Sequence, residues 1–133
     1  MKSELLNINE NIQPIFKNRY IVEFPEEIGI TPLMVLNIEK ENYYTNFFKL
    51  TLREIEDKNI KCLPLLLKDI VDTKKVFEIK IHILNPKNEV LYTEVYNGSN
   101  FLSFIRNGLS YNENDIITYS ICVNYENMFY SLN

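Results

Sequence analysis

The single histidine is the residue best suited to acid–base chemistry in this sequence of 133 residues. His82 lies in an alternating segment, on the same side as Glu78 and Lys80. An imidazole titrates near neutral pH and could serve as a general base or as a metal ligand. A catalytic triad or a Cys–His pair needs a histidine beside other reactive groups. Because the chain has one histidine, any such site would have to include His82. We expect His82 to be a solvated or interface residue, with a base or a ligand as the alternative.

Two pairs of acidic residues are the next candidates. Glu26 and Glu27 follow a proline, and Glu113 and Asp115 flank an asparagine. Either pair could supply carboxylates for acid–base catalysis or oxygen ligands for Ca²⁺. The second pair belongs to the segment 112–115, which lacks the glycine and the distal glutamate of an EF-hand loop. A tight turn between two strands is the simpler interpretation of that segment.

The cysteines and glycines do not indicate a cofactor site. Cys62 and Cys122 have no CxxC partner, and two cysteines with one histidine are too few for a zinc site. Each cysteine is expected to be a small buried hydrophobe. Gly29, Gly98 and Gly108 belong to no GxGxxG or GxxxxGK element, so we expect no nucleotide phosphate site. We therefore predict no catalytic, cofactor-binding or metal-binding residues, no cofactor and no enzyme activity.

Charge and hydropathy bear on two further classes of partner. The chain has 14 basic and 18 acidic residues, a net charge of −4. Sequence-independent binding of nucleic acid needs clustered lysines and arginines, so this charge argues against it. The densest apolar patch, 63–67, is interrupted by Pro64 and is shorter than the roughly 18 residues of a membrane helix. The segment 1–6 lacks the apolar stretch of a signal peptide. We expect an intracellular chain with no membrane span.

Alternating residues predict that most elements are strands. The chain has no alanine and no tryptophan but 9 tyrosines and 8 phenylalanines, a composition that favours β structure. Period-two patterns predict strands over 20–24, 33–39, 43–56, 76–84, 89–96 and 117–125. The longest of these is either one strand or two joined by a bend near Asn46. The residues expected to face the core in the two clearest strands are Phe77, Ile79, Ile81, Ile83, Ile117, Tyr119, Ile121 and Val123.

The segments between the strands predict a helix and a turn. Apolar residues recur at three- and four-residue spacing from Leu63 to Val71, which predicts a helix over about 63–74 with Pro64 in its first turn. The segment 85–88, Asn-Pro-Lys-Asn, predicts the turn of a hairpin.

The last segments complete the predicted fold. Residues 99–107 are expected to form a shorter helix or an irregular loop, with Gly108 as its C-cap. Residues 1–14 show no strong period and are expected to be a mobile arm. The elements together predict a mainly β fold in a single domain, 1–133: a small antiparallel β-barrel or sandwich with one packed α-helix.

Two segments near the ends of the chain resemble those of one known family. The first is 18–24, Asn-Arg-Tyr-Ile-Val-Glu-Phe. The second is 109–125, a short strand, an Asn/Asp turn and an alternating strand with aromatic residues. With a helix midway and an Asn-Pro hairpin before the last strands, the chain resembles the tail tube proteins of contractile-tailed bacteriophages. A tryptophan that often follows in the family is absent, because 125–129 reads Tyr-Glu-Asn-Met-Phe.

The resemblance implies a structural virion protein. Family members fold as a β-barrel or sandwich and close into hexameric rings, which stack into a hollow tube that conducts the genome inside a contractile sheath. The implied partners are further copies of the chain, sheath proteins, baseplate or neck proteins, and viral DNA that passes without specific binding. The implied location is the virion tail, assembled in the host cytoplasm. The open alternatives are a baseplate, neck or injection-system tube component, and a small-ligand- or peptide-binding β-barrel with an enclosed apolar pocket.

A tube that conducts DNA should expose acidic and neutral polar groups to its channel, because inward lysines or arginines would bind phosphates. Within this interpretation, Glu78, Glu54 and Glu56 are the candidates to line the channel. Lys80 and Arg53 neighbour them and would have to be paired or lie in a subunit interface. The segment 25–30 and the arm 1–14 are expected to make ring-to-ring contacts.

Overall fold

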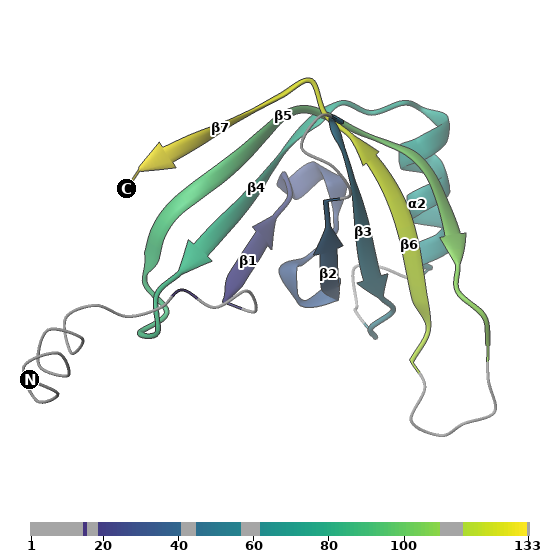
Figure 1. Ribbon diagram of the computed structural model, residues 1–133. Helices are drawn as coiled ribbons and strands as arrows, with labels where there is room; N and C mark the ends of the chain where they lie inside the picture. The colour runs from purple at the N-terminus through teal and green to yellow at the C-terminus, as the bar shows by residue number, and fades with distance from the viewer. Residues whose placement is uncertain (1–14, 16–18, 41–44, 57–61, 110–115, 133) are drawn as a thin grey trace, which may run out of the picture.

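Two antiparallel sheets that share one long strand form most of the structure (Figure 1). The computed structural model describes residues 15, 19–40, 45–56, 62–109 and 116–132. The strands, in chain order, are β1 (Tyr20–Glu23), β2 (Val35–Glu39), β3 (Phe47–Arg53), β4 (Phe77–Leu84), β5 (Val90–Arg106), β6 (Thr118–Asn124) and β7 (Asn127–Leu132). The other elements are the short 3₁₀ helices η1 (Glu26–Ile28) and η2 (Pro32–Met34) and the helix α2 (Leu63–Asp72).

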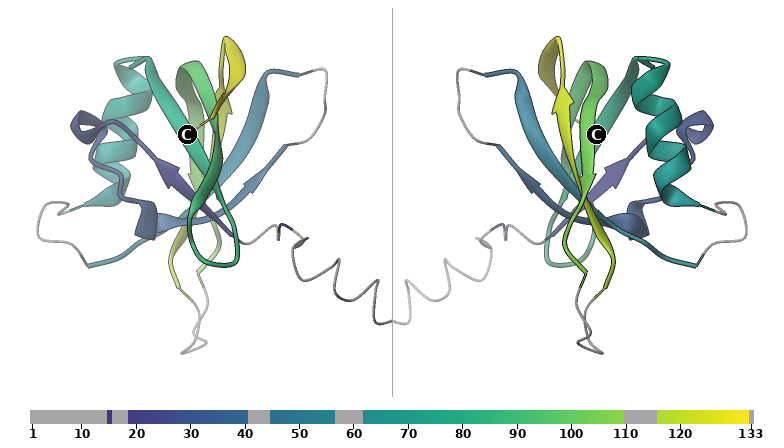
Figure 2. Two further views of the ribbon diagram at one scale, coloured as in Figure 1. Left: turned by 90° about the vertical axis from the view of Figure 1, so that its left-hand side faces the viewer. Right: turned by 90° about the vertical axis from the view of Figure 1, so that its right-hand side faces the viewer.

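The order of the strands defines the two sheets. Sheet A is β1-β4-β5-β7, and sheet B is β5-β6-β3-β2, with β5 common to both. The sheets diverge from β5 as the two walls of a wedge (Figure 2). No pairing joins β1 to β2 within the described ranges, so the sheet does not close. The predicted mainly β fold is therefore confirmed, in the form of an open sandwich.

The inner faces of the two sheets share one core. The fully buried residues of the core include Val22, Met34, Phe48, Leu50, Leu52, Leu67, Ile70, Ile79, Tyr96, Phe101, Ile121 and Val123. The predicted inward faces of β4 and β6 are confirmed except at their ends. Ile83 is only half-buried. The placement of Ile117 was wrong: β6 begins one residue later, and Ile117 is 40% exposed.

Helix α2 confirms the predicted helix, although it ends at Asp72 rather than at residue 74. Pro64 lies in its first turn, where the missing N–H costs nothing because that group has no intrahelical partner. Leu63, Leu67 and Ile70 are buried and join the core. The helix packs against β5 and lies beside the wedge (Figures 1 and 2).

The predicted short helix or loop over 99–107 was wrong, because β5 continues through this segment to Arg106. The strand bends at Gly98, which has a positive φ of 66°. Ser99 follows, fully buried, and its hydroxyl donates to the carbonyl oxygen of Tyr96 at 2.9 Å. Before the bend β5 pairs with β4 and β7, and after it with β6. Glycine, serine and asparagine are typical of loops, but long-range pairing on both sides overrides that local preference.

Replacing Gly98 with alanine should destabilise the protein by about 1–2 kcal/mol, the usual cost of a left-handed backbone for a residue with a Cβ. An added Cβ would also lie 2.6 Å from Cγ of Glu126, whose flexible side chain would have to move. Denaturant unfolding followed by circular dichroism measures the change. Gly108→Ala is the matched control, because its Cβ meets nothing within 4 Å. An equal loss in both variants would contradict the role given to the bend.

The remaining predictions concern one hairpin, one strand and two segments. The hairpin at 85–88 is confirmed, since β4 and β5 flank it and pair antiparallel. The strand predicted over 33–39 begins with η2 and becomes β2 only at Val35. The arm 1–14 and the turn 112–115 lie outside the described residues.

Candidate assembly surface

His82 lies in a row of hydrogen bonds across three neighbouring strands of sheet A. Its Nε2 is 2.7 Å from a carboxylate oxygen of Glu23 on β1, and its Nδ1 is 2.8 Å from the hydroxyl of Thr93 on β5. A carboxylate can only accept, so the Nε2–H of His82 donates to Glu23. Thr93 is buried. The row ties the edge strand β1 to the sheet.

The other residues considered for catalysis or metal binding lie on different elements. Cys62 precedes α2 and Cys122 lies on β6, both as free thiols and both half-buried. Glu26 and Glu27 are exposed in η1. Within the described ranges, no group of three or more His, Cys, Asp or Glu side chains is arranged to hold a metal ion. No described helix is long and apolar enough to cross a membrane.

The acids predicted to line a channel do not lie on one surface. Glu78 is on the outward face of sheet A, 3.9 Å from the ammonium of Lys80. Glu54 follows β3 in sheet B, where it accepts a hydrogen bond of 3.4 Å from the hydroxyl of Tyr119. Glu56 is exposed two residues later. Arg53 donates from Nε to the carbonyl oxygen of Leu33 at 2.8 Å, a contact within the chain.

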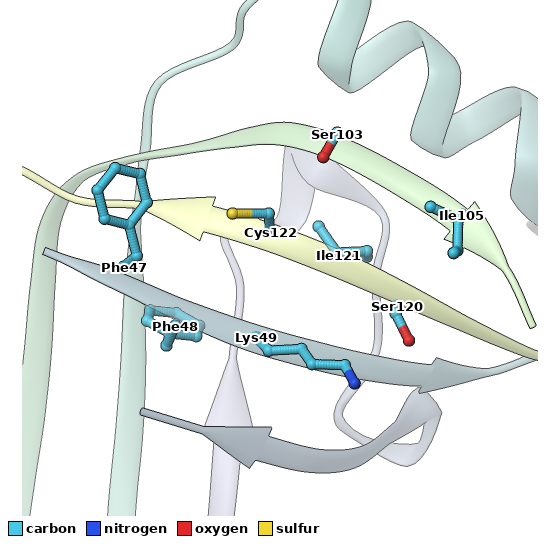
Figure 3. Close-up of a pocket in the computed structure, with 8 residues that line it drawn as sticks. All are labelled: Phe47, Phe48, Lys49, Ser103, Ile105, Ser120, Ile121 and Cys122. Atoms are coloured by element: carbon cyan, nitrogen blue, oxygen red, sulfur yellow. The ribbon is translucent and has the colours of Figure 1, made fainter. Parts of the chain in front are cut away.

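The outward face of sheet B contains a shallow hollow of about 230 Å³ (Figure 3). Its origin is the small size of the residues on the middle strand, β6. Ser120 and Cys122 lie on this face, between Phe47 and Lys49 of β3 and Ile105 of β5. The larger side chains rise on both sides of the small ones. The hollow therefore has apolar walls, with hydroxyl and thiol groups at its base.

The charge of this outward face is opposite in sign to that of the whole chain. The strands β3, β5 and β6 contribute Lys49 and Arg53 to it and no acid. On the neighbouring strand β2, Glu39 lies beside this face, with its Cα paired with that of Lys49. Neither Lys49 nor Arg53 takes part in an ion pair among the described residues. The hollow is thus mostly apolar, with Lys49 as the charged residue of its lining.

A second hollow, of about 330 Å³, lies between the inner faces of the two sheets. Tyr96 is on its wall and donates to a carboxylate oxygen of Glu94 at 2.9 Å. Burial, and then Glu94, raise the pKa of Tyr96, so the phenol stays protonated and keeps donating. The ammonium of Lys40, from the end of β2, lies 4.8 Å from the ring centroid of Tyr96. Lys40 and Tyr96 thus form part of the wall of this hollow together.

β7 is an edge strand that exposes apolar side chains. In the described structure it pairs only with β5, so one of its edges is unpaired. Phe129, Tyr130 and Leu132 are 47%, 63% and 84% exposed. Soluble proteins usually protect such edges with charges, prolines or bulges. A long unprotected edge with apolar residues indicates a surface that pairs with another strand.

The fold is similar to that of proteins from contractile injection systems. A chain of the sheath–tube complex of the extracellular contractile injection system PVC, in its extended state, superposes with a TM-score of 0.65 at 14% identity, covering 96% of this chain and 97% of that one. A chain of the tube-terminating cap of the anti-feeding prophage gives 0.66 at 14% identity, covering 91% and 93%. Hcp1 from Flavobacterium johnsoniae gives 0.58 at 9% identity, covering 86% and 96%.

These likenesses show the fold over nearly the whole chain. No family model matches the sequence, and no curated protein matches it. The structural neighbours are tail-tube-like proteins, so the resemblance stated from the two terminal segments is confirmed at the level of fold. The fold thus agrees with the order of strands, helix and hairpin that first indicated it.

Proposed function

We propose that this chain is a structural subunit of the tube of a contractile tail, and that its copies form stacked, hexameric rings. The observation that carries the proposal is the end-to-end match with a chain of a sheath–tube complex. The unprotected edge of β7 supports it independently, because the edge offers a way for copies to join. Another similar chain belongs to a baseplate determined with six-fold symmetry, which supports the hexameric order.

Ring closure would use β7 in a head-to-tail contact. Its unpaired edge would join an unpaired edge of the next copy, so that two different surfaces meet at each interface. Such heterologous contacts generate closed rings when the rotation between copies closes. The exposed Phe129, Tyr130 and Leu132 would become buried between the copies.

The outward face of sheet A is our candidate for the channel lining. It carries Glu23 and Glu78 against Lys80 and His82, whereas the outward face of sheet B carries Lys49 and Arg53 against Glu39. A channel that conducts DNA should not hold phosphates, which favours the face with the acids. Glu78 thus remains a candidate for the lining.

In the phage form of this proposal, the tube is part of the virion tail, is assembled in the host cytoplasm, and contacts sheath and baseplate or neck proteins. Viral DNA passes through it without specific binding. The neighbours named above come from injection systems, which favours, as a second candidate, a tube that delivers another cargo. In both forms the chain acts as a structural protein without a cofactor.

Negative-stain microscopy of the purified protein tests the proposal directly. We expect rings of uniform diameter, or tubes with an axial repeat of one ring, at high protein concentration. The ring symmetry follows from class averages viewed along the axis. A protein that stays monomeric at every concentration and binds a small ligand would overturn the proposal in favour of a ligand-binding β-sandwich.

A further inference from the structure

We propose that Asn97 is a site of spontaneous deamidation, at which its side-chain amide is lost through a cyclic imide formed with Gly98. The backbone nitrogen of Gly98 attacks Cγ of Asn97, a C–N bond forms, and ammonia leaves. Water then opens the imide at either of its carbonyl groups, which leaves aspartate or isoaspartate at position 97. The reaction consumes water and releases ammonia, and it needs no cofactor and no enzyme.

The dipeptide Asn-Gly favours this reaction because glycine has no side chain. Asparagine is among the chemically labile residues, and a Cβ on the following residue would shield the attacking nitrogen and restrict its rotation. The chain contains two such dipeptides, 97–98 and 107–108. Both asparagines therefore have a similar intrinsic reactivity, and the folded structure decides which of them can react.

The first dipeptide lies at a break in the strand ladders of β5. The register of β4 and β5 shifts between Phe77 and Ile79, so that Glu78 alone lies opposite both Asn97 and Gly98. This is the pattern of a β-bulge, which interrupts the ladder locally. In the described structure Gly98 has no Cα partner on β4, β6 or β7. The nitrogen that must attack thus belongs to a residue outside the regular ladders.

The side chain of Asn97 is unrestrained, whereas that of Asn107 is held. Asn97 is exposed, and within the described ranges its side chain makes no hydrogen bond. The amide of Asn107 donates to the hydroxyl of Thr118 at 2.7 Å, and its carbonyl oxygen accepts from the hydroxyl of Ser120 at 3.2 Å. Both hydrogen bonds must break before Cγ of Asn107 can meet the next nitrogen. Asn107 should therefore react more slowly.

The start of β7 controls the remaining freedom of the reactive peptide. The N–H of Glu126 donates to the carbonyl oxygen of Asn97 at 2.9 Å, and Asn127 is the Cα partner of Asn97. The peptide between Asn97 and Gly98 can turn only when this hydrogen bond opens. β7 is an edge strand, and the ends of such elements open locally at little cost in free energy. The reaction would thus follow a transient release of the first residues of β7.

The product would weaken the pairing of β7 in turn. Isoaspartate adds one carbon to the backbone of β5 and displaces the oxygen that accepts from Glu126. β7 would then pair less well with β5 in aged chains, those in which Asn97 has reacted. Because β7 is proposed to join the copies, aged chains should assemble less readily. This consequence rests on the proposed function, whereas the reaction itself does not.

Peptide mapping by mass spectrometry tests the site with an internal control. Trypsin cleaves after lysine and arginine, so it places Asn97 in the peptide 88–106 and Asn107 in 107–133. The folded protein is incubated at mildly alkaline pH, and the converted fraction of each asparagine is followed with time. We expect Asn97 to react severalfold faster than Asn107 and to give both isoaspartate and aspartate. In denaturant the two rates should become similar.

Two variants assign the signal to its cause. Asn97→Gln should remove the reaction from the peptide 88–106, because glutamine forms the corresponding larger ring much more slowly. Thr118→Val should accelerate the reaction of Asn107, because it removes one hydrogen bond of that amide. Equal rates for Asn97 and Asn107 in the folded protein would overturn the proposal. So would a product that contains aspartate alone, since opening of the imide gives both acids.

Sedimentation velocity tests the consequence for assembly. The wild-type chain and Asn97→Gln are aged for the same time, and each is compared with its own fresh sample. We expect only the aged wild-type chain to need a higher protein concentration for assembly. An equal change in both chains would overturn the effect on β7 and leave the deamidation site in place. A chain that never assembles would overturn the proposed function, while the peptide map would still decide on Asn97.

Discussion

The double variant Phe129→Lys with Leu132→Lys should lose ring and tube assembly while the monomer remains folded. Both side chains are exposed on β7, whose unpaired edge is proposed to join the next copy. Lysines on an edge strand oppose edge-to-edge pairing, because the ammonium groups must stay hydrated. Sedimentation velocity and negative-stain microscopy, at concentrations where the unmodified protein assembles, measure the effect. We expect monomers and no particles.

The size of the effect follows from the repetition of the contact. Each apolar cross-strand contact contributes about 0.2–1 kcal/mol, and the variant removes two per interface. A loss of about 1.4 kcal/mol weakens one interface tenfold, and every interface of a ring is weakened together. The two contacts together contribute about 0.4–2 kcal/mol, so assembly should require about two- to thirtyfold more protein.

A matched control separates the edge from simple charge. Val76→Lys with Leu109→Lys adds the same two charges and removes two apolar side chains of 68% and 62% exposure. Val76 precedes β4 and Leu109 follows β5, so neither belongs to β7. The control should assemble as the unmodified protein does. Equal loss in both variants, or normal assembly of the β7 variant, would refute the edge contact.

Much of the fold could be predicted from the sequence because short-range alternation reports which side of a strand is buried. Ile79, Ile81 and Ile121 were placed in the core correctly for that reason. The course of β5 could not be predicted, because Gly98 and Ser99 are typical of a loop. They form a strand only because β4, β6 and β7 pair on both sides of the bend. Which strands meet is a long-range property that one sequence does not reveal.

The hollow on sheet B is a second feature that could be predicted only in part from the sequence. The alternation in 117–125 places Ser120 and Cys122 together on the polar face of a strand. The sequence does not show that this strand lies between Phe47 and Ile105, which are 58 positions apart in the chain. A run of small residues becomes a hollow only beside larger neighbours. The unpaired edge of β7 was missed for a similar reason, since an edge exists only when the sheet order is known.

Ile121→Ala should lower the free energy of unfolding by about 2–5 kcal/mol, the usual cost of truncating a buried isoleucine. Ile121 is fully buried on β6, with Leu50 of β3 and Phe104 of β5 as its Cα partners. Removing its side chain would leave a cavity between the inner faces of both sheets. Since domains are stabilised by only about 5–15 kcal/mol, the change is a large fraction of the total.

The matched control is Ile117→Ala, four positions earlier on the same side of the alternating pattern. Because Ile117 is 40% exposed, its truncation should change the free energy of unfolding by less than about 0.5 kcal/mol. Both variants are unfolded with denaturant at protein concentrations below the onset of assembly, because self-association would stabilise the folded state further. Equal destabilisation would restore the inward placement of Ile117 predicted from alternation. No effect at Ile121 would mean that β6 does not present this side to the core.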